Sequence, residues 1–170
     1  MQSISAEGRP ALVALGARVR LVSAKGSREV PVSGLFVAPK DENTREIALR
    51  PDEILTEIIV PAPAAHSATN EVRQKEALDW PLAAASVALT MKGNAVATAK
   101  VVLGHVAPIP WEVLAAEKAL AGKTITMASA EAAGKAAVEG AQPLNRNAYK
   151  VQLAKVAVKR ALLDAAKVKA

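Results

Sequence analysis

The chain is 170 residues long, has a formal net charge of +6 and contains no cysteine. This length accommodates one ordinary hydrophobic core, or one domain together with part of another. Without cysteine the chain cannot form disulfides, perform thiolate chemistry or ligate an iron–sulfur cluster. No apolar run approaches the roughly 20 residues that span a bilayer, and the first residues lack the pattern of a signal peptide. We therefore expect a cytoplasmic protein that does not bind membranes.

Basic residues gather toward the C-terminus, in the segment that we expect to form the last helix. Aromatic residues make up only 2% of the chain, so few side chains could stack on bases, and no nucleic-acid-binding motif is present. The pattern favours a charged helix face or an acidic protein partner over nucleic-acid binding. The basic residues are Lys150, Lys155, Lys159, Arg160, Lys167 and Lys169.

The first third of the chain has the alternating pattern of β-strands. Residues 11–32 predict a hairpin, in which a turn at 24–27 separates two apolar alternations. Glycine, proline, aspartate and asparagine within 33–46 predict a loop, and residues 54–60 predict a further strand. Residues 61–70 contain two prolines and several small side chains, which is typical of a linker between domains.

The middle of the chain predicts a three-stranded antiparallel sheet. Its strands are expected over 71–77, 83–91 and 99–106, where apolar residues lie two positions apart. Residues 92–94, Lys-Gly-Asn, form a tight turn between the second and third of these strands.

The spacing of apolar residues then changes to that of helices. It predicts helices over 111–120 and 127–139, and a third helix that begins near Asn147. Ser129 and Asn147 are residue types that cap helix N-termini. The chain therefore predicts an α+β fold, in which three helices cover one face of the three-stranded sheet.

The residues alone indicate neither a catalytic group nor a metal site. His66, expected to be exposed in the linker, and His105, expected in the core or at a strand edge, are far apart in the sequence. No carboxylates cluster with them at ligand spacing, and no serine lies in a G-x-S-x-G setting. No glycine-rich segment offers consecutive backbone N–H groups to a phosphate.

The sequence Asp79-Trp80-Pro81 is the most distinctive local feature. Proline forces the preceding residue into an extended conformation, so Trp80 is expected at a strand entrance. Its indole either packs on the sheet or forms an aromatic wall near a planar cofactor or a partner subunit. Arg73 and Lys75 lie two positions apart and so share one strand face, where they are either solvated or neutralise the phosphates of a ligand.

Residues 71–111 contain several of these features in a recognisable order. A basic strand leads into the Asp-Trp turn, and a later strand ends in the pattern Gly-x-Val-Ala-Pro-x-Pro. On this pattern the segment resembles the C-terminal domain of the FAD-binding (medium) subunit of molybdenum hydroxylases, the family of xanthine dehydrogenase and carbon monoxide dehydrogenase. The matching positions are Arg73, Asp79, Trp80, Gly104, Val106, Ala107, Pro108 and Pro110.

The resemblance extends over nearly the whole chain. Segments similar to residues 11–23 and 49–61 lie in the second half of the family's FAD-binding domain. Segments similar to residues 116–126 and 143–162 belong to the helices of the C-terminal domain. The ordered series of similar segments, rather than any one short motif, identifies the family.

The resemblance implies two domains and a role in electron transfer. Residues 1–61 would be the β-rich C-terminal part of an FAD-binding domain, and residues 62–170 the α+β C-terminal domain of the medium subunit. In such complexes electrons pass from a molybdopterin-containing large subunit, through the 2Fe-2S clusters of an iron–sulfur small subunit, to FAD and then to NAD or another acceptor. The implied cofactor of the medium subunit is FAD, and the implied partners are the small and large subunits.

Four residues match positions near the flavin in the family. Val19 matches a strand residue that lies against the flavin, Arg45 matches the arginine of a loop that flanks the isoalloxazine ring, and Asp79 and Trp80 match a nearby turn. Relatives of the xanthine dehydrogenase type often have tyrosine before the loop arginine, where this chain has Thr44. The resemblance therefore does not transfer a ring-stacking role to this loop.

The glycine-rich FAD loops of the family's upstream half have no counterpart in this sequence. We therefore expect a component of an oxidoreductase complex that is not catalytic alone. It would complete a flavin site together with a further segment, such as a separate N-terminal FAD-binding chain. The alternative is a non-catalytic assembly or interaction module derived from the same subunit.

Overall fold

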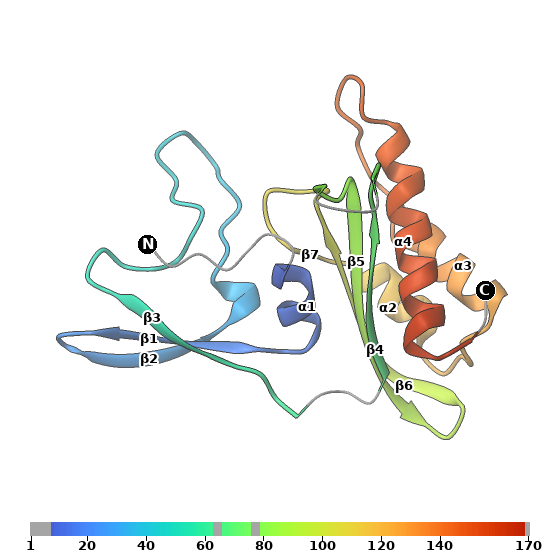
Figure 1. Cartoon of the computed structure of the whole chain (residues 1–170), viewed down its shortest axis with the longest axis horizontal. Helices are drawn as coiled ribbons and strands as arrows, with labels where there is room; N and C mark the ends of the chain where they lie inside the picture. The colour runs from blue at the N-terminus through green and yellow to red at the C-terminus, as the bar shows by residue number, and fades with distance from the viewer. Residues whose placement is uncertain (1–7, 63–65, 76–78, 169–170) are drawn as a thin grey trace.

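The computed structural model describes residues 8–62, 66–75 and 79–168, which form two antiparallel sheets with helices between and beside them (Figure 1). The first sheet has the strand order β2-β1-β3 and the second has the order β4-β5-β6-β7. No helix in these ranges is both long and apolar enough to cross a membrane. The strands are β1 (Arg18–Ser23), β2 (Gly26–Pro31), β3 (Ile54–Ile59), β4 (His66–Val72), β5 (Ala83–Lys92), β6 (Ala95–Gly104) and β7 (Trp111–Glu112). The helices are α1 (Gly8–Ala14), the 3-10 helix η1 (Val32–Gly34), α2 (Leu114–Leu120), α3 (Met127–Ala136) and α4 (Tyr149–Ala165).

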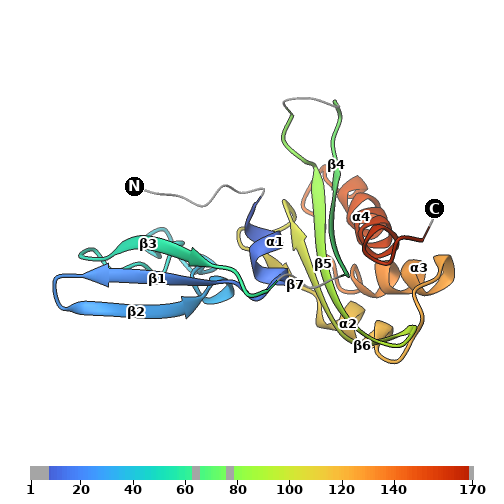
Figure 2. The ribbon, with the colours of Figure 1, turned by 60° about the horizontal axis from the view of Figure 1, so that its bottom comes forward.

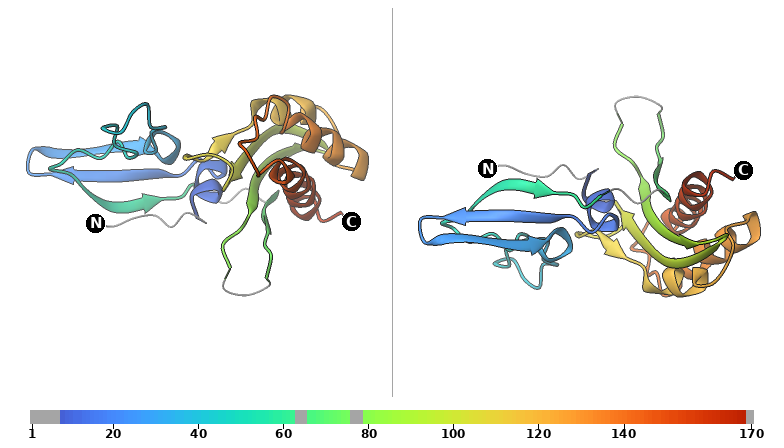
Figure 3. Two further views of the ribbon diagram at one scale, coloured as in Figure 1. Left: turned by 90° about the horizontal axis from the view of Figure 1, so that it is seen from above. Right: turned by 90° about the horizontal axis from the view of Figure 1, so that it is seen from below.

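The second sheet is the middle layer of the molecule. α1 and the first sheet lie on one side of it, and α2, α3 and α4 lie on the other (Figures 2 and 3). All five residues from Ala83 to Val87 in β5 are buried, because both faces of the strand are covered. The predicted α+β fold is confirmed, with β7 as a short fourth strand paired to β6.

The first core lies where the first sheet meets α1. Val19 and Leu21 point inward from β1, in alternation with outward residues. Val102 of β6 belongs to the same core, so the two sheets share buried apolar surface. The predicted hairpin is confirmed, with Ser23 opposite Gly26. The core comprises Val13, Ala14, Ala17, Val19, Leu21, Val32, Leu35, Phe36 and Val102.

The opposite face of the first sheet is polar. Arg20 bridges two strands, since its guanidinium contacts Glu29 of β2 at 2.9 Å and Glu57 of β3 at 2.7 Å. β3 lies at an edge of this sheet, and its Ile54 and Ile58 side chains are 64% and 43% exposed. Ion pairs therefore organise one face of the sheet, while apolar side chains stay exposed along one edge.

The second core is built from small side chains. Alanine and valine from β5 and β6 meet alanine and leucine from α4, so the helix backbone can approach the sheet closely. α3 packs on α4 through Gly134, where a Cβ atom would lie 2.7 Å from the carbonyl oxygen of Lys155. This contact requires glycine at position 134.

Three strand predictions need correction. The strand predicted over 99–106 is β6, which begins at Ala95 and ends at Gly104. Residues 11–14 lie in α1 rather than in a strand, because a short apolar run fits either element and burial against the second sheet selects the helix. The strand predicted over 71–77 is β4, which begins at His66 and ends at Val72; residues 76–77 lie outside the described ranges. β4 is an edge strand with mainly polar side chains. Its pairing with β5 extends it into residues that were predicted to form a linker. His66 is consequently half-buried, with Nδ1 3.4 Å from the carbonyl oxygen of Ala165.

The helix boundaries also differ from those predicted. Trp111 and Glu112 pair with β6, so α2 begins only at Leu114. The N-cap of α3 is Thr126, and Ser129 is the third helical residue of a capping box with it. Ala148 occupies the N-cap position of α4 and no side chain caps that helix. The side chain of Asn147 therefore does not have its predicted role.

We expect Gly134→Ala to destabilise the fold, although alanine is favoured over glycine within a helix by about 1 kcal/mol. The added methyl group would force α3 away from α4, and overpacking of this kind costs roughly 1–3 kcal/mol. Thermal unfolding followed by circular dichroism should give a lower Tm than that of the wild type. Lys135→Ala, at the neighbouring exposed position, is the matched control and should change the Tm little. An unchanged Tm for Gly134→Ala would contradict the close helix contact.

Candidate functional site

A basic concavity lies at the C-terminal end of β4, where this strand runs beside α4. It is lined by Thr69, Glu71, Val72, Arg73, Gln74, Lys75 and Arg160. Three cationic side chains face one carboxylate, and Arg73 forms an ion pair with that carboxylate, Glu71. Lys75 and Arg160 form no ion pair with the described residues. The concavity therefore keeps an excess of positive charge that can attract an anionic group.

Asp79 and Trp80 lie at the described end of the connection between β4 and β5. The Asp79 carboxylate accepts a hydrogen bond from the backbone N–H of Lys75 at 3.3 Å, which joins the two ends of this connection. Trp80 is 67% exposed, so the interpretation in which its indole packs on the sheet is wrong. An exposed indole close in the chain to cationic side chains is suited to contact a planar, anionic molecule.

Arg45 lies in the connection between β2 and β3. It is exposed and lines a shallow hollow with Arg9, Phe36, Glu46, Ile47 and Pro108. The connection is closed by a bridge between Phe36 and Ile47, and the Arg9 guanidinium lies 4.8 Å from the centre of the Phe36 ring. This hollow combines an aromatic face with two arginines.

The structure does not gather the four predicted flavin-site residues into one site. Val19 is fully buried in the first core, so within the described residues its side chain has no open surface. The connection that contains Arg45 and the ends of β4 and β5 near Asp79 and Trp80 project from opposite sides of the molecule (Figure 3). Only Asp79 and Trp80 lie together, and the flavin contacts of all four residues stay predictions.

Sequence reasoning missed Arg160 as a member of the basic concavity. This residue lies in α4, far along the chain from Arg73, and α4 packs against β4. The sequence indicates only that Arg160 belongs to the basic C-terminal segment, and this does not distinguish it from the other basic residues there. Within the described residues no three histidine, aspartate or glutamate side chains are grouped as metal ligands would be.

A partly buried ion pair between Arg28 and Glu53 anchors the connection that contains Arg45. The Glu53 side chain is 4% exposed and accepts hydrogen bonds from Arg28 at 2.6 and 2.8 Å and from the backbone N–H of Arg50 at 2.8 Å. The hydrogen bonds from the Arg28 guanidinium, with the help of that backbone N–H, lower the pKa of Glu53 from 4.5 to about 2, although burial acts in the opposite direction. Arg28 also donates to the carbonyl oxygen of Ala48 at 3.0 Å, so β2 holds the end of the connection.

Comparison with known proteins defines the class to which this chain belongs. Residues 67–165 match the family model described as CO dehydrogenase flavoprotein C-terminal domain. Residues 1–63 match the model described as FAD binding domain in molybdopterin dehydrogenase. The class is therefore that of flavoprotein subunits of molybdenum-dependent dehydrogenases.

Curated relatives and solved structures agree with this class. The chain is 33% identical over 159 residues to the carbon monoxide dehydrogenase medium chain of Hydrogenophaga pseudoflava. The aligned region covers 90% of this chain and 54% of that protein. It is 31% identical over 114 residues to the glyceraldehyde dehydrogenase medium chain of Sulfolobus acidocaldarius, covering 67% of this chain and 39% of that protein. The chain belongs to the family of FAD-binding medium subunits of molybdenum hydroxylases, as its sequence pattern predicts.

The fold comparison gives the same result. A structure of carbon monoxide dehydrogenase from Hydrogenophaga pseudoflava aligns with a TM-score of 0.81 and 30% identity, over 97% of this chain and 60% of that one. Quinoline 2-oxidoreductase from Pseudomonas putida 86 aligns with a TM-score of 0.81 and 26% identity, over 94% of this chain and 55% of that one. The chain spans about half the length of the curated relatives it matches.

We expect Glu53→Gln to destabilise the fold in a pH-dependent way. Because the pKa of Glu53 is about 2 in the folded chain and 4.5 as the unperturbed value, its ionised form stabilises the fold above the higher value. That stabilisation is lost as the pH falls toward the lower value. The difference in Tm between wild type and variant should therefore be largest above the unperturbed pKa and shrink below it.

Glu42→Gln, which changes an exposed carboxylate in the same connection, is the control for this experiment. It should show a much smaller difference from the wild type at every pH. A difference for Glu53→Gln that stays constant across the titration would exclude the depressed pKa as its cause.

Proposed function

We propose that the chain is the C-terminal part of the FAD-binding medium subunit of a molybdenum hydroxylase complex of the carbon monoxide dehydrogenase type. The observation that supports this most strongly is the alignment of nearly the whole chain, in sequence and in fold, with medium chains about twice as long. In this proposal residues 1–61 complete the FAD-binding domain, and residues 62–170 form the domain that follows it.

The residues of the chain fit part of a flavin site. Arg73, Lys75 and Arg160 place positive charge in the basic concavity, which suits the pyrophosphate of FAD. Trp80 offers an exposed aromatic face nearby in the chain, which suits a planar ring. The nine glycines lie at least six positions apart in the sequence, farther than in the glycine-rich loops that hold phosphates, so the close backbone approach that such a loop provides must come from other residues. The role of this chain is then to supply charge and aromatic surface to a site completed elsewhere.

Bound FAD would supply the electron-accepting and electron-donating chemistry of the site. The side chains named above would hold its phosphates, orient its ring and limit the access of water. The proposed partners are an iron–sulfur small subunit and a molybdenum large subunit, with NAD or another molecule as the final electron acceptor. We also propose that the complex works in the cytoplasm.

A second candidate function is assembly without redox activity. The helical layer over the second sheet is well packed, whereas the sequence contains no glycine-rich phosphate loop. A chain of this kind could hold partner subunits together through its C-terminal domain. The two candidates differ in one measurable property, because only the first requires bound flavin.

The test is to express the chain together with the upstream part of the Hydrogenophaga pseudoflava medium chain, the part that precedes the aligned segment. We expect a complex that retains FAD, measured from the flavin absorption bands and from the ratio of flavin to protein. Trp80→Ala should weaken FAD binding by about tenfold, which corresponds to roughly 1.4 kcal/mol of lost aromatic contact. Arg73→Gln should weaken it through lost charge.

Tyr149→Ala and Arg146→Gln are matched controls, since both residues are exposed and lie outside the basic concavity. Neither should change the flavin content. A complex that assembles without flavin would support the assembly function instead. Equal flavin binding by the wild type, Trp80→Ala and Arg73→Gln would contradict the proposal that this chain contributes to the flavin site.

A further inference from the structure

The basic concavity contains a carboxylate among its cationic groups. Arg73, Lys75 and Arg160 are its basic lining residues, and Glu71 is the one acid that lines it among the described residues. The volume of the concavity is about 780 Å³, within the range of small-molecule sites in proteins. The Glu71 carboxylate therefore lies in the space where an anion attracted by the three cations would bind.

The alternation of β4 brings Glu71 beside Arg73. Residues two positions apart in an extended chain lie on one face, and Val72 between them packs against the second core instead. The Arg73 guanidinium donates a hydrogen bond to the Glu71 carboxylate and forms an ion pair with it. The two side chains are 32% and 22% exposed, so a small anion in solution can reach this pair.

The ion pair makes the three basic groups unequal. Lys75 and Arg160 are exposed and form no ion pair with the described residues, whereas Arg73 is already neutralised. A guanidinium has five N–H donors in a planar fork, and this geometry matches two oxygens of one phosphate group. A phosphate that takes the fork of Arg73 must therefore replace the Glu71 carboxylate.

This replacement is feasible because the ion pair is partly exposed. Ion pairs in such positions are weak, and a multiply charged anion would interact with Lys75 and Arg160 as well as with Arg73. The displaced Glu71 carboxylate would still lie well within the Debye length of about 10 Å, so it would repel the bound anion. Both effects lower the affinity of the concavity for phosphate.

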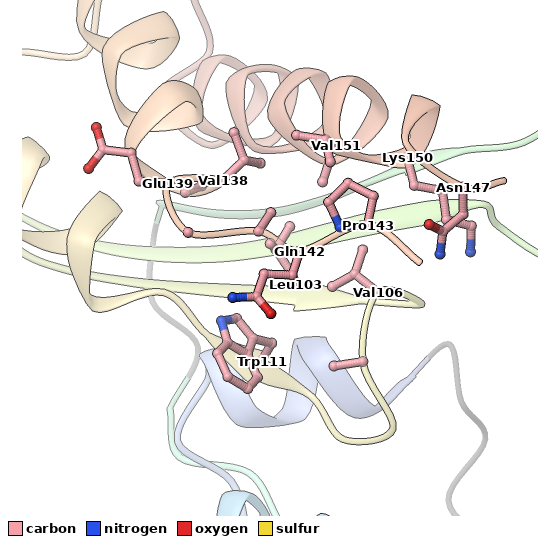
Figure 4. Close-up of a pocket in the computed structure, with 15 residues that line it drawn as sticks. Leu103, Val106, Trp111, Val138, Glu139, Gln142, Pro143, Asn147, Lys150 and Val151 are labelled. Atoms are coloured by element: carbon pink, nitrogen blue, oxygen red, sulfur yellow. The ribbon is translucent and has the colours of Figure 1, made fainter. Parts of the chain in front are cut away.

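A separate hollow of the molecule lacks this arrangement. It lies between β7 and the segment that joins α3 to α4, and its charged lining residues are Glu139 and Lys150 (Figure 4). One acid and one base leave it without an excess of positive charge, and the Lys150 Nζ atom donates to the carbonyl oxygen of His105 at 3.2 Å. Glu139 is therefore a suitable control for the loss of a carboxylate outside the basic concavity.

We propose that Glu71 is an intramolecular competitor for the phosphate group that the basic concavity binds. Its carboxylate holds the Arg73 guanidinium in the unliganded chain and gives way when a phosphate or pyrophosphate group enters. The proposal concerns the site of the proposed flavin role and rests on that role only for the source of the phosphate. This source is either the pyrophosphate of FAD or a free phosphate compound.

The first test measures the binding of inorganic pyrophosphate to the full-length chain without flavin, by isothermal titration calorimetry. We expect a Kd on the order of 0.1–1 mM for the wild type. Glu71→Gln keeps the size of the side chain and removes its charge, and it should tighten binding about fivefold. Arg73→Gln should weaken binding at least about threefold through the loss of the guanidinium.

The double variant Glu71→Gln/Arg73→Gln separates competition for Arg73 from a general effect of charge. If Glu71 acts through Arg73, Glu71→Gln should tighten binding by less than about twofold once Arg73 is replaced. Equal tightening in both backgrounds overturns the proposal. So does weaker binding by Glu71→Gln alone, because Glu71 would then position Arg73 for the ligand. Absence of pyrophosphate binding in every variant also overturns it.

Glu139→Gln is the matched control, since it makes the same change of charge in the separate hollow, and its Kd should equal that of the wild type. Circular dichroism of each variant checks the fold, and Glu71→Thr replaces Glu71→Gln if the latter unfolds.

The source of the phosphate is tested in the complex with the upstream part of the medium chain. If FAD is the source, Glu71→Gln should also tighten FAD binding there. If Glu71→Gln tightens pyrophosphate binding alone, the competitor is supported, the ligand is a free phosphate compound and the concavity has no role in holding the flavin.

Discussion

Close backbone contacts on both faces of the second sheet are the constraint on which the rest of the structure depends. On one face Gly104 of β6 meets α1, where a Cβ atom would lie 2.6 Å from Cγ of Pro10. On the other face alanines let α4 lie against β5, and Gly134 lets α3 lie against α4. Because side chains of this size cannot be enlarged without moving a layer, the first sheet and the helical layer are both held against one central sheet. The surface features described above follow from these fixed positions.

α4 contributes a basic side chain to each of two separate hollows. Arg160 lines the basic concavity and Lys150 lines a separate hollow, which Trp111 and Val151 also line, and ten residues of helix separate them by about 15 Å. Two of the six basic residues of the C-terminal segment therefore line separate concave surfaces, and a third, Lys155, pairs with Glu131 of α3, so the basic residues do not form one continuous stripe. A continuous stripe would be expected of a helix that tracks a nucleic-acid backbone. The distribution agrees better with separate anionic groups of small molecules or proteins.

Much of the fold could be predicted from local patterns, because alternation and turn chemistry act over a few residues. The hairpin that turns between Ser23 and Gly26 and the tight turn at 92–94 are of this kind. α1 and the start of β4 could not be predicted, since burial against the second sheet and pairing with β5 decide them. At the candidate site, Trp80 stood out because proline follows it, whereas nothing in the sequence placed Arg160 beside Arg73. The side chain of Asn147 suggested a helix cap, and only the geometry of α4 shows that another residue has this position.

The edge strand β3 has a consequence for the behaviour of the chain in solution. Its outer edge has unpaired backbone donors and acceptors within the described residues, and Ile54 and Ile58 are exposed beside them. Such an edge is a template for the addition of another strand. Glu57 is the one charged side chain in the strand, and its pairing with Arg20 lessens the repulsion that would otherwise keep neighbouring molecules apart. A neighbouring polypeptide that adds a strand to β3 would cover both the backbone groups and the two isoleucines, so the colloidal stability of the chain depends on whether this edge is covered.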